Sequence, residues 1–257
     1  MAHDNPYDGM ISLPDRVAGS MTGSEFGASI HDVPLGAARE RAILQQILAG
    51  NMPTWMSSGK PVSVSWNNHY AVFWALPDYL CVGSNDDYLL CPMNPLTAQQ
   101  IADVVGGALP TRKMVDAIWK TAAVQLEPIP FPPGPEMSST PYFLRHNSEV
   151  QKQLLERPFG ALVVGHKKDI VVCKDLRAGR VAIYGWHHVS GTPIQPLNAV
   201  SHDCYYADYS HGARLVAKSV YVDDQRYMDV GEILQSSELY GLLSDEGPLE
   251  RTGYGDR

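Results

Sequence analysis

The segment from Arg180 to Val222 constrains the fold of this 257-residue chain more than any other part of the sequence. It contains four of the nine histidines, together with Trp186 and a dense run of tyrosine, aspartate and serine. This composition is too polar for a buried core and too rich in β-branched and aromatic residues for a linker. We therefore expect two or three strands whose ends carry chemically active side chains.

The other elements divide along the chain, with helices predicted mainly before residue 157 and strands mainly after it. Apolar residues at helical spacing predict helices at 35–48, 97–105, 111–122 and 148–156. β-branched and aromatic runs predict early strands at 62–66 and 69–83, with a hairpin over 76–93. Later hairpins are expected around turns at 166–169, 189–192 and 223–225.

This segregation predicts an α+β fold, because few βαβ alternations are present. Helices are expected mainly in the N-terminal half, and an antiparallel sheet or partly closed barrel mainly in the C-terminal half. Residues 1–34 are predicted to form an N-terminal arm, and residues 35–257 a single catalytic domain. The proline-rich segment 127–137 is expected to cross the surface of that domain as a stiff strap.

Charge and composition exclude several classes of partner. The net charge of −8 argues against nucleic acid or an anionic membrane as the main partner, and no apolar run reaches membrane-spanning length.

The four cysteines show no zinc-finger spacing, and the first residues show no signal peptide. The compartment therefore stays open, because a secreted mature form would look the same, and the oligomeric state is equally open.

The first candidate site lies in the predicted strand 181–188. With a period of two, Gly185 and His187 share one face, and the missing side chain of Gly185 would leave a gap for a ligand beside His187. Trp186 would line the same cleft. The alternative is an edge strand whose histidines face solvent.

The second candidate site is the polar segment 201–215. If it is extended, Asp203, Tyr209 and His211 share one face, while Asp208 and Ser210 lie on the other. A carboxylate and an imidazole on one face are the parts of a general acid–base site, and an Asp203–His211 pair would raise the imidazole pKa. Arg214 follows closely enough to hold an anion. The alternative is a satisfied polar network without catalysis.

A third candidate site binds anions at the start of the predicted helix 111–122. Thr111, Arg112 and Lys113 would offer a hydroxyl, two cations and free backbone N–H groups. The alternative is that both cations point into solvent. In the turn 166–169, His166 is a further candidate for substrate contact or catalysis, whereas Lys168 is expected to be solvated.

These sites favour a hydrolase of a polar, anionic biopolymer, such as a cell-wall glycan or peptide. Asp203, Asp208, His211 and His187 would perform acid–base catalysis. The remaining candidates would bind the substrate: Thr111, Arg112, Lys113, Trp186, Tyr209, Ser210, Arg214 and His166. We assign no metal ligand and expect no cofactor. Two alternatives are a carbohydrate-binding module with an aromatic platform and a metal-dependent enzyme that uses the C-terminal histidines.

Overall fold

The main sheet is built on a hairpin of β-branched and aromatic residues. In the computed structural model, which describes residues 11–155, 157–224 and 226–255, β1 (Lys60–Trp66) pairs with β2 (His69–Ala75). Asn67 and Asn68 join them with φ angles of 48° and 65°, the left-handed turn that asparagine tolerates and that suits the strand twist.

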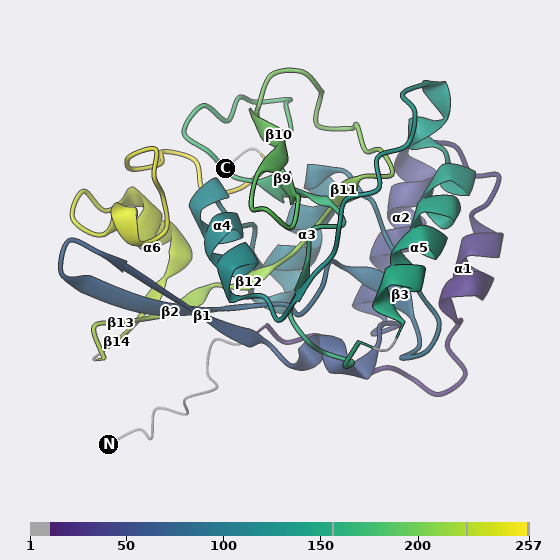
Figure 1. Ribbon diagram of the computed structural model, residues 1–257, viewed down its shortest axis with the longest axis horizontal. Helices are drawn as coiled ribbons and strands as arrows, with labels where there is room; N and C mark the ends of the chain where they lie inside the picture. Colours follow the sequence, from purple (N-terminus) through teal and green to yellow (C-terminus); the bar gives the residue numbers. More distant parts are fainter. Residues whose placement is uncertain (1–10, 156, 225, 256–257) are drawn as a thin grey trace.

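Four short strands complete this curled antiparallel sheet, in the order β14-β13-β2-β12-β5, with β1 paired to β2. They are β5 (Gly107–Ala108), β12 (Val216–Ala217), β13 (Ser219–Val222) and β14 (Arg226–Asp229). The long hairpin, β13, β14 and α6 (Val230–Gln235) gather at one end of the molecule (Figure 1).

A second sheet carries the candidate sites and has the order β10-β9-β8-β11. Its strands are β8 (Lys168–Val171), β9 (Ala182–His187), β10 (Pro193–Asn198) and β11 (His211–Gly212). β8 pairs antiparallel with β9 and parallel with β11, so it is an inner strand. Two minor sheets add β3 (Cys81–Gly83) with β4 (Tyr88–Leu90) and β6 (Val124–Gln125) with β7 (Val163–Val164).

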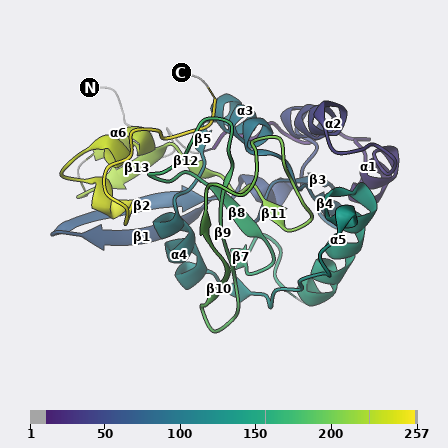
Figure 2. The same ribbon diagram turned by 90° about the horizontal axis from the view of Figure 1, so that it is seen from above.

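Three of the helices begin at a side chain that caps them. Asn94, Thr111 and Ser139 each accept a first-turn backbone N–H at the start of α3 (Pro95–Val105), α4 (Arg112–Thr121) and α5 (Thr140–Leu154). Figure 2 shows α5 grouped with α1 (Gly23–Ser29) and α2 (Ala37–Leu48) at the end opposite α6, with the second sheet between the two ends. No helix in the described residues is long and apolar enough to cross a membrane.

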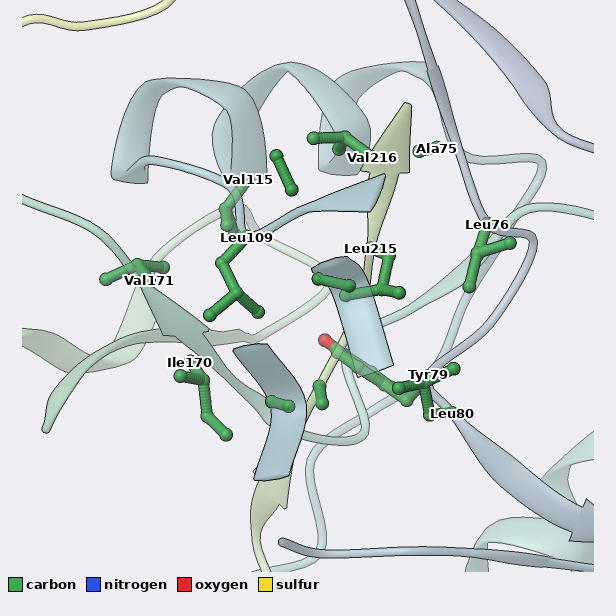
Figure 3. Close-up of a cluster of buried hydrophobic side chains, with 14 of the residues drawn as sticks. Ala75, Leu76, Tyr79, Leu80, Leu109, Val115, Ile170, Val171, Leu215 and Val216 are labelled. Atoms are coloured by element: carbon green, nitrogen blue, oxygen red, sulfur yellow. The ribbon is translucent and has the colours of Figure 1, made fainter. Parts of the chain in front are cut away.

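One large cluster of buried apolar residues connects both sheets and the helices. Leu76, Leu109, Val115, Ile170 and Leu215 converge in it from five separate segments (Figure 3). Burial of such side chains contributes about 1.5–3 kcal/mol each, so this cluster is the main source of stability.

The α+β class predicted from the sequence is confirmed, as are the hairpins β3–β4, β9–β10 and β13–β14. The expected hairpin turn at 166–169 is wrong, because these residues enter the inner strand β8 and are buried. The segment 201–215 is not one extended strand, because turns fill it up to β11. The predicted arm contains α1. Residues 1–10 of that arm, Glu156 and Gln225 lie outside the described residues.

Candidate functional site

Two consecutive residues with left-handed backbone interrupt β9. Gly185 has a φ of 101° and Trp186 a φ of 56°. A positive φ in a bulky aromatic residue is a true outlier, and such strain concentrates at functional sites. It also breaks the alternation of side chains, so Tyr184 and His187 reach the same partner although a regular strand would point them to opposite faces.

That partner is Asp116 on α4. Its Oδ1 accepts the Tyr184 hydroxyl at 2.9 Å and lies 3.1 Å from His187 Nε2. His187 is 4 % exposed, whereas the Asp116 side chain is 35 % exposed, so the pair joins the interior to the surface. Because the Asp116 carboxylate only accepts, Nε2 carries the proton of the neutral His187 ring. Nδ1 is then the nitrogen that can accept a proton. The expected gap at Gly185 is small, because a Cβ there would lie 3.4 Å from this ring.

A second carboxylate, Asp169, is buried on the strand next to His187. Tyr79 donates its hydroxyl to Asp169 Oδ2 at 2.8 Å. Burial raises the pKa of Asp169 to about 6, although the charges of Arg214 and His187 and the Tyr79 hydrogen bond act against this rise. Asp169 therefore changes its charge near neutral pH, which is unusual for a carboxyl group.

Arg214 is held beside this carboxyl group by neutral partners. Its Nη1 donates to the Leu76 carbonyl at 2.7 Å, its Nη2 donates to the Val163 carbonyl, and its guanidinium lies 4.3 Å from the centre of the Tyr79 ring. No ion pair of Arg214 is found among the described residues. A guanidinium group has five N–H donors, so these two hydrogen bonds leave others that can donate to a negatively charged group.

A small cavity connects these groups. Its walls include Tyr79, Asp169, His187 and Arg214, closed by the rings of Trp119 and Trp186, with Lys167 also in the lining. The cavity has room for roughly one water molecule. Trp119, which is partly exposed, lies 5.8 Å from the His187 ring and forms the outer side.

Lys167, which also lines this cavity, forms a neighbouring centre with His146 and Tyr209. Its Nζ donates to the Tyr209 carbonyl and lies 3.1 Å from His146 Nδ1. Burial lowers the pKa of Lys167 to about 7, against the opposing charges of Asp208 and two other groups. Burial, with the Lys167 charge, also lowers the pKa of His146 to about 2, so its imidazole is neutral.

Asp208, Ser210 and His211 form a third centre, on the opposite face of β8 from Asp169. Asp208 accepts Ser210 Oγ at 2.5 Å and Lys168 Nζ at 3.0 Å, and its Oδ1 lies 3.1 Å from His211 Nδ1. Burial acts to raise the pKa of Asp208, but the charges and hydrogen bonds of these neighbours hold it well below its usual range. Lys168, which forms the ion pair with Asp208, is buried, so the expectation of a solvated turn at this residue is wrong.

The expected pair of Asp203 with His211 is wrong. Asp203 is exposed and accepts the backbone N–H of Tyr205 at 2.8 Å, whereas His211 faces Asp208. Burial lowers the pKa of His211 instead of the expected rise. Ser210 donates to the same carboxylate that His211 contacts, and no hydrogen bond joins a serine and a histidine side chain in the described part of the chain.

The expected anion site on α4 is occupied by the chain itself. Thr111 donates its hydroxyl to the Leu243 carbonyl, and Lys113 donates to the Gly241 carbonyl. Arg112 pairs with Asp245 at 2.9 Å. These residues attach the C-terminal segment to α4 instead of leaving both cations free.

The remaining candidates also have internal partners. His166 Nε2 lies 2.9 Å from Asp78 Oδ1, and both side chains are buried. Tyr209 and Trp186 are buried while Tyr205 is 67 % exposed, so they form no shared aromatic platform. No group of three or more histidine, cysteine, aspartate or glutamate side chains that could hold a metal ion occurs in the described parts of the chain.

The structure thus brings His187, Trp186 and Arg214 together and adds Asp116, Tyr79 and Asp169, which sequence analysis missed. Asp169 lies in a run of charged residues, which sequence patterns associate with exposed turns. The available signal was the apolar runs on both sides of it, which are typical of an inner strand. Comparison of the chain with known protein families, curated proteins and solved structures finds no match.

Proposed function

We propose that the chain is a hydrolase that acts on a polar, anionic cell-wall polymer by aspartate–histidine acid–base catalysis. The observation that carries this proposal is the cavity shared by Asp169, whose pKa is raised to about 6, and His187, which is held by Asp116. Two titratable groups with different environments in one cavity are the usual arrangement of an acid–base pair.

His187 would be the general base and Asp169 the general acid. The Nε2–H group of His187 would donate a hydrogen bond to Asp116, so Nδ1 would be the atom that takes a proton from a water molecule. An imidazole held by a carboxylate acts in the same way in hydrolytic triads. The resulting hydroxide attacks the scissile centre, and protonated Asp169 gives its proton to the leaving group. His187 then releases its extra proton to solvent, and Asp169 takes up a proton from solvent, so both groups return to their starting states. Arg214 would stabilise negative charge that develops in the transition state.

The walls of the cavity favour a sugar as the substrate. Trp119, which is partly exposed, presents a ring surface on which a sugar ring could stack, and the Arg214 charge in the cavity wall suits an acidic substrate. The scissile group would enter beside Trp119 and His187, because the cavity itself holds only about one water molecule. A peptide attached to such a glycan is the second candidate substrate.

The test is an assay of released reducing ends and free amines from cell-wall fragments and acidic polysaccharides. His187→Gln and Asp169→Asn should each reduce the rate roughly 10²–10⁴-fold, the usual contribution of a general acid or base. The rate of the unmodified protein should fall as pH rises through about 6, where Asp169 loses its proton, and Asp169→Asn should lack this limb.

His31→Gln is the matched control, because His31 also faces a carboxylate, at 2.7 Å from Asp32, but on the surface. It should leave the rate unchanged. Equal rates in the two cavity variants and the control would contradict the proposed site. Failure to release either product from any of these polymers would contradict the proposed class of substrate.

A further inference from the structure

A second concave site lies at the far end of the β8–β9 pair and is lined by three arginines. Arg177, Arg180 and Arg251 surround a cavity of about 320 Å³, together with Tyr205. This volume is within the range of small-molecule sites, about 300–1,000 Å³. This cavity adjoins the end of β8 at Val171, whereas Asp169 and His187 lie toward the opposite end of the β8–β9 pair. The two cavities are therefore separate.

Three segments distant in sequence build this site. A turn with a hydrogen bond from the Arg180 backbone N–H to the Arg177 carbonyl, at 3.2 Å, places both arginines on one loop. The Cys204 backbone N–H donates to the Gly179 carbonyl at 3.0 Å, which holds Tyr205 beside that loop. Tyr254 donates its hydroxyl to the Val171 carbonyl at 2.6 Å and thereby fixes the segment that carries Arg251.

The three guanidinium groups form no ion pair with any residue that the structure describes. The described lining contains no acidic side chain, although Asp203 lies opposite Arg180 in an isolated backbone bridge. Within the described residues, Arg251 alone of the three side chains has a hydrogen bond, to the Gly255 carbonyl at 3.2 Å. In a chain of net charge −8, three unpaired cations around one cavity concentrate positive potential against the overall charge.

We propose that this cavity binds a phosphorylated small molecule that carries a flat ring, the chemistry of a nucleotide. Guanidinium groups bind phosphate oxygens through paired hydrogen bonds, which explains the choice of arginine. Tyr205 is 67 % exposed, so its ring is available to stack on the ring of the ligand. This site does not depend on the proposed hydrolase function.

The test is isothermal titration calorimetry of the full chain with adenosine monophosphate, adenosine and inorganic phosphate. We expect saturable binding of adenosine monophosphate, weaker binding of phosphate and adenosine, and a loss of phosphate affinity at high salt. Arg177→Gln, Arg180→Gln and Arg251→Gln should each weaken adenosine monophosphate binding roughly tenfold, because each removes hydrogen bonds to a charged group.

Two further variants separate the contributions. Tyr205→Ala should weaken binding of adenosine monophosphate and leave that of phosphate unchanged. Arg41→Gln is the matched control, since Arg41 is exposed on α2, and it should change neither affinity. Absence of saturable binding by both adenosine monophosphate and inorganic phosphate would overturn the proposal. Full affinity for adenosine monophosphate in a variant that combines Arg177→Gln, Arg180→Gln and Arg251→Gln would also overturn it. Unchanged affinity for adenosine monophosphate in Tyr205→Ala would overturn the assignment of a stacked ring.

Discussion

Two buried ionisable residues have pKa values shifted toward neutral pH. Asp169 and Lys167 are both buried, and burial raises the pKa of the first and lowers the pKa of the second. Both shifts have one cause, since low dielectric disfavours the charged form of either group. The two residues therefore change protonation within a narrow range around neutral pH.

Asp169 should make the free energy of unfolding depend on pH. Its folded pKa of about 6 lies above the reference value of 3.8, so the folded state keeps a proton that the unfolded state releases. The stability that Asp169 contributes is present below about pH 4 and is lost as pH rises through 6, a loss on the order of 3 kcal/mol.

Urea denaturation between pH 4 and 8 measures this effect. Asp169→Asn should remove most of the decrease in the free energy of unfolding between pH 4 and 6, because asparagine does not ionise. Asp86→Asn, at an exposed position, should retain it. Identical pH dependence in both variants would show that Asp169 ionises normally.

At the scale of elements, the left-handed backbone of β9 positions the His187 imidazole. Gly185→Ala should lower the free energy of unfolding by about 1–2 kcal/mol, because φ at this position is 101°. It should also reduce activity, since the rotation at 185–186 directs His187 to Asp116. Gly134→Ala is the control, with an extended φ of 174° and only a flexible glutamate side chain nearby. Equal stability of the two variants in chemical denaturation would contradict this account.

The proline-rich strap is a second element with a defined role. Phe131 stacks on the Tyr209 ring at 5.1 Å, and its backbone N–H donates to the Tyr209 hydroxyl at 2.6 Å. Because the Tyr209 carbonyl accepts from Lys167, the strap supports the buried lysine. Phe131→Ala should therefore destabilise the fold by about 1–3 kcal/mol.

The exposed Phe159 offers the control for this substitution. Phe159→Ala should change the free energy of unfolding by less than about 0.5 kcal/mol, as is usual at exposed positions. Thermal or urea denaturation of both variants tests the difference. A strap without structural contribution would leave Phe131→Ala as stable as Phe159→Ala.

For the whole molecule, the continuous core predicts one cooperative unfolding transition. The same cluster contains residues of α2, the main sheet and the second sheet, including Ile43, Phe73 and Ile170. Elements that share one core lose their packing together. Tryptophan fluorescence and far-ultraviolet circular dichroism should therefore give coincident urea transitions, and two separated midpoints would show two independently stable units.

The sequence alone was sufficient for the fold class and for several of the local elements. Helix α4 with its cap at Thr111 and the hairpin β9–β10 follow from apolar periodicity, capping residues and turn residues, all of which act between neighbours in the chain. It also indicated that His187, Trp186 and Arg214 belong to a polar site. These residues stand out because their types are unusual in the strand pattern around them.

Only the tertiary structure decided which side chains meet. Asp116 and His187 are 71 positions apart, and the alternation of a regular strand would separate Tyr184 from His187. Asp169 became a buried carboxyl group because β8 lies between β9 and β11, a parallel partner from a distant segment. Local patterns contain no information on such partners, since burial of a charged residue depends on what the rest of the chain packs around it.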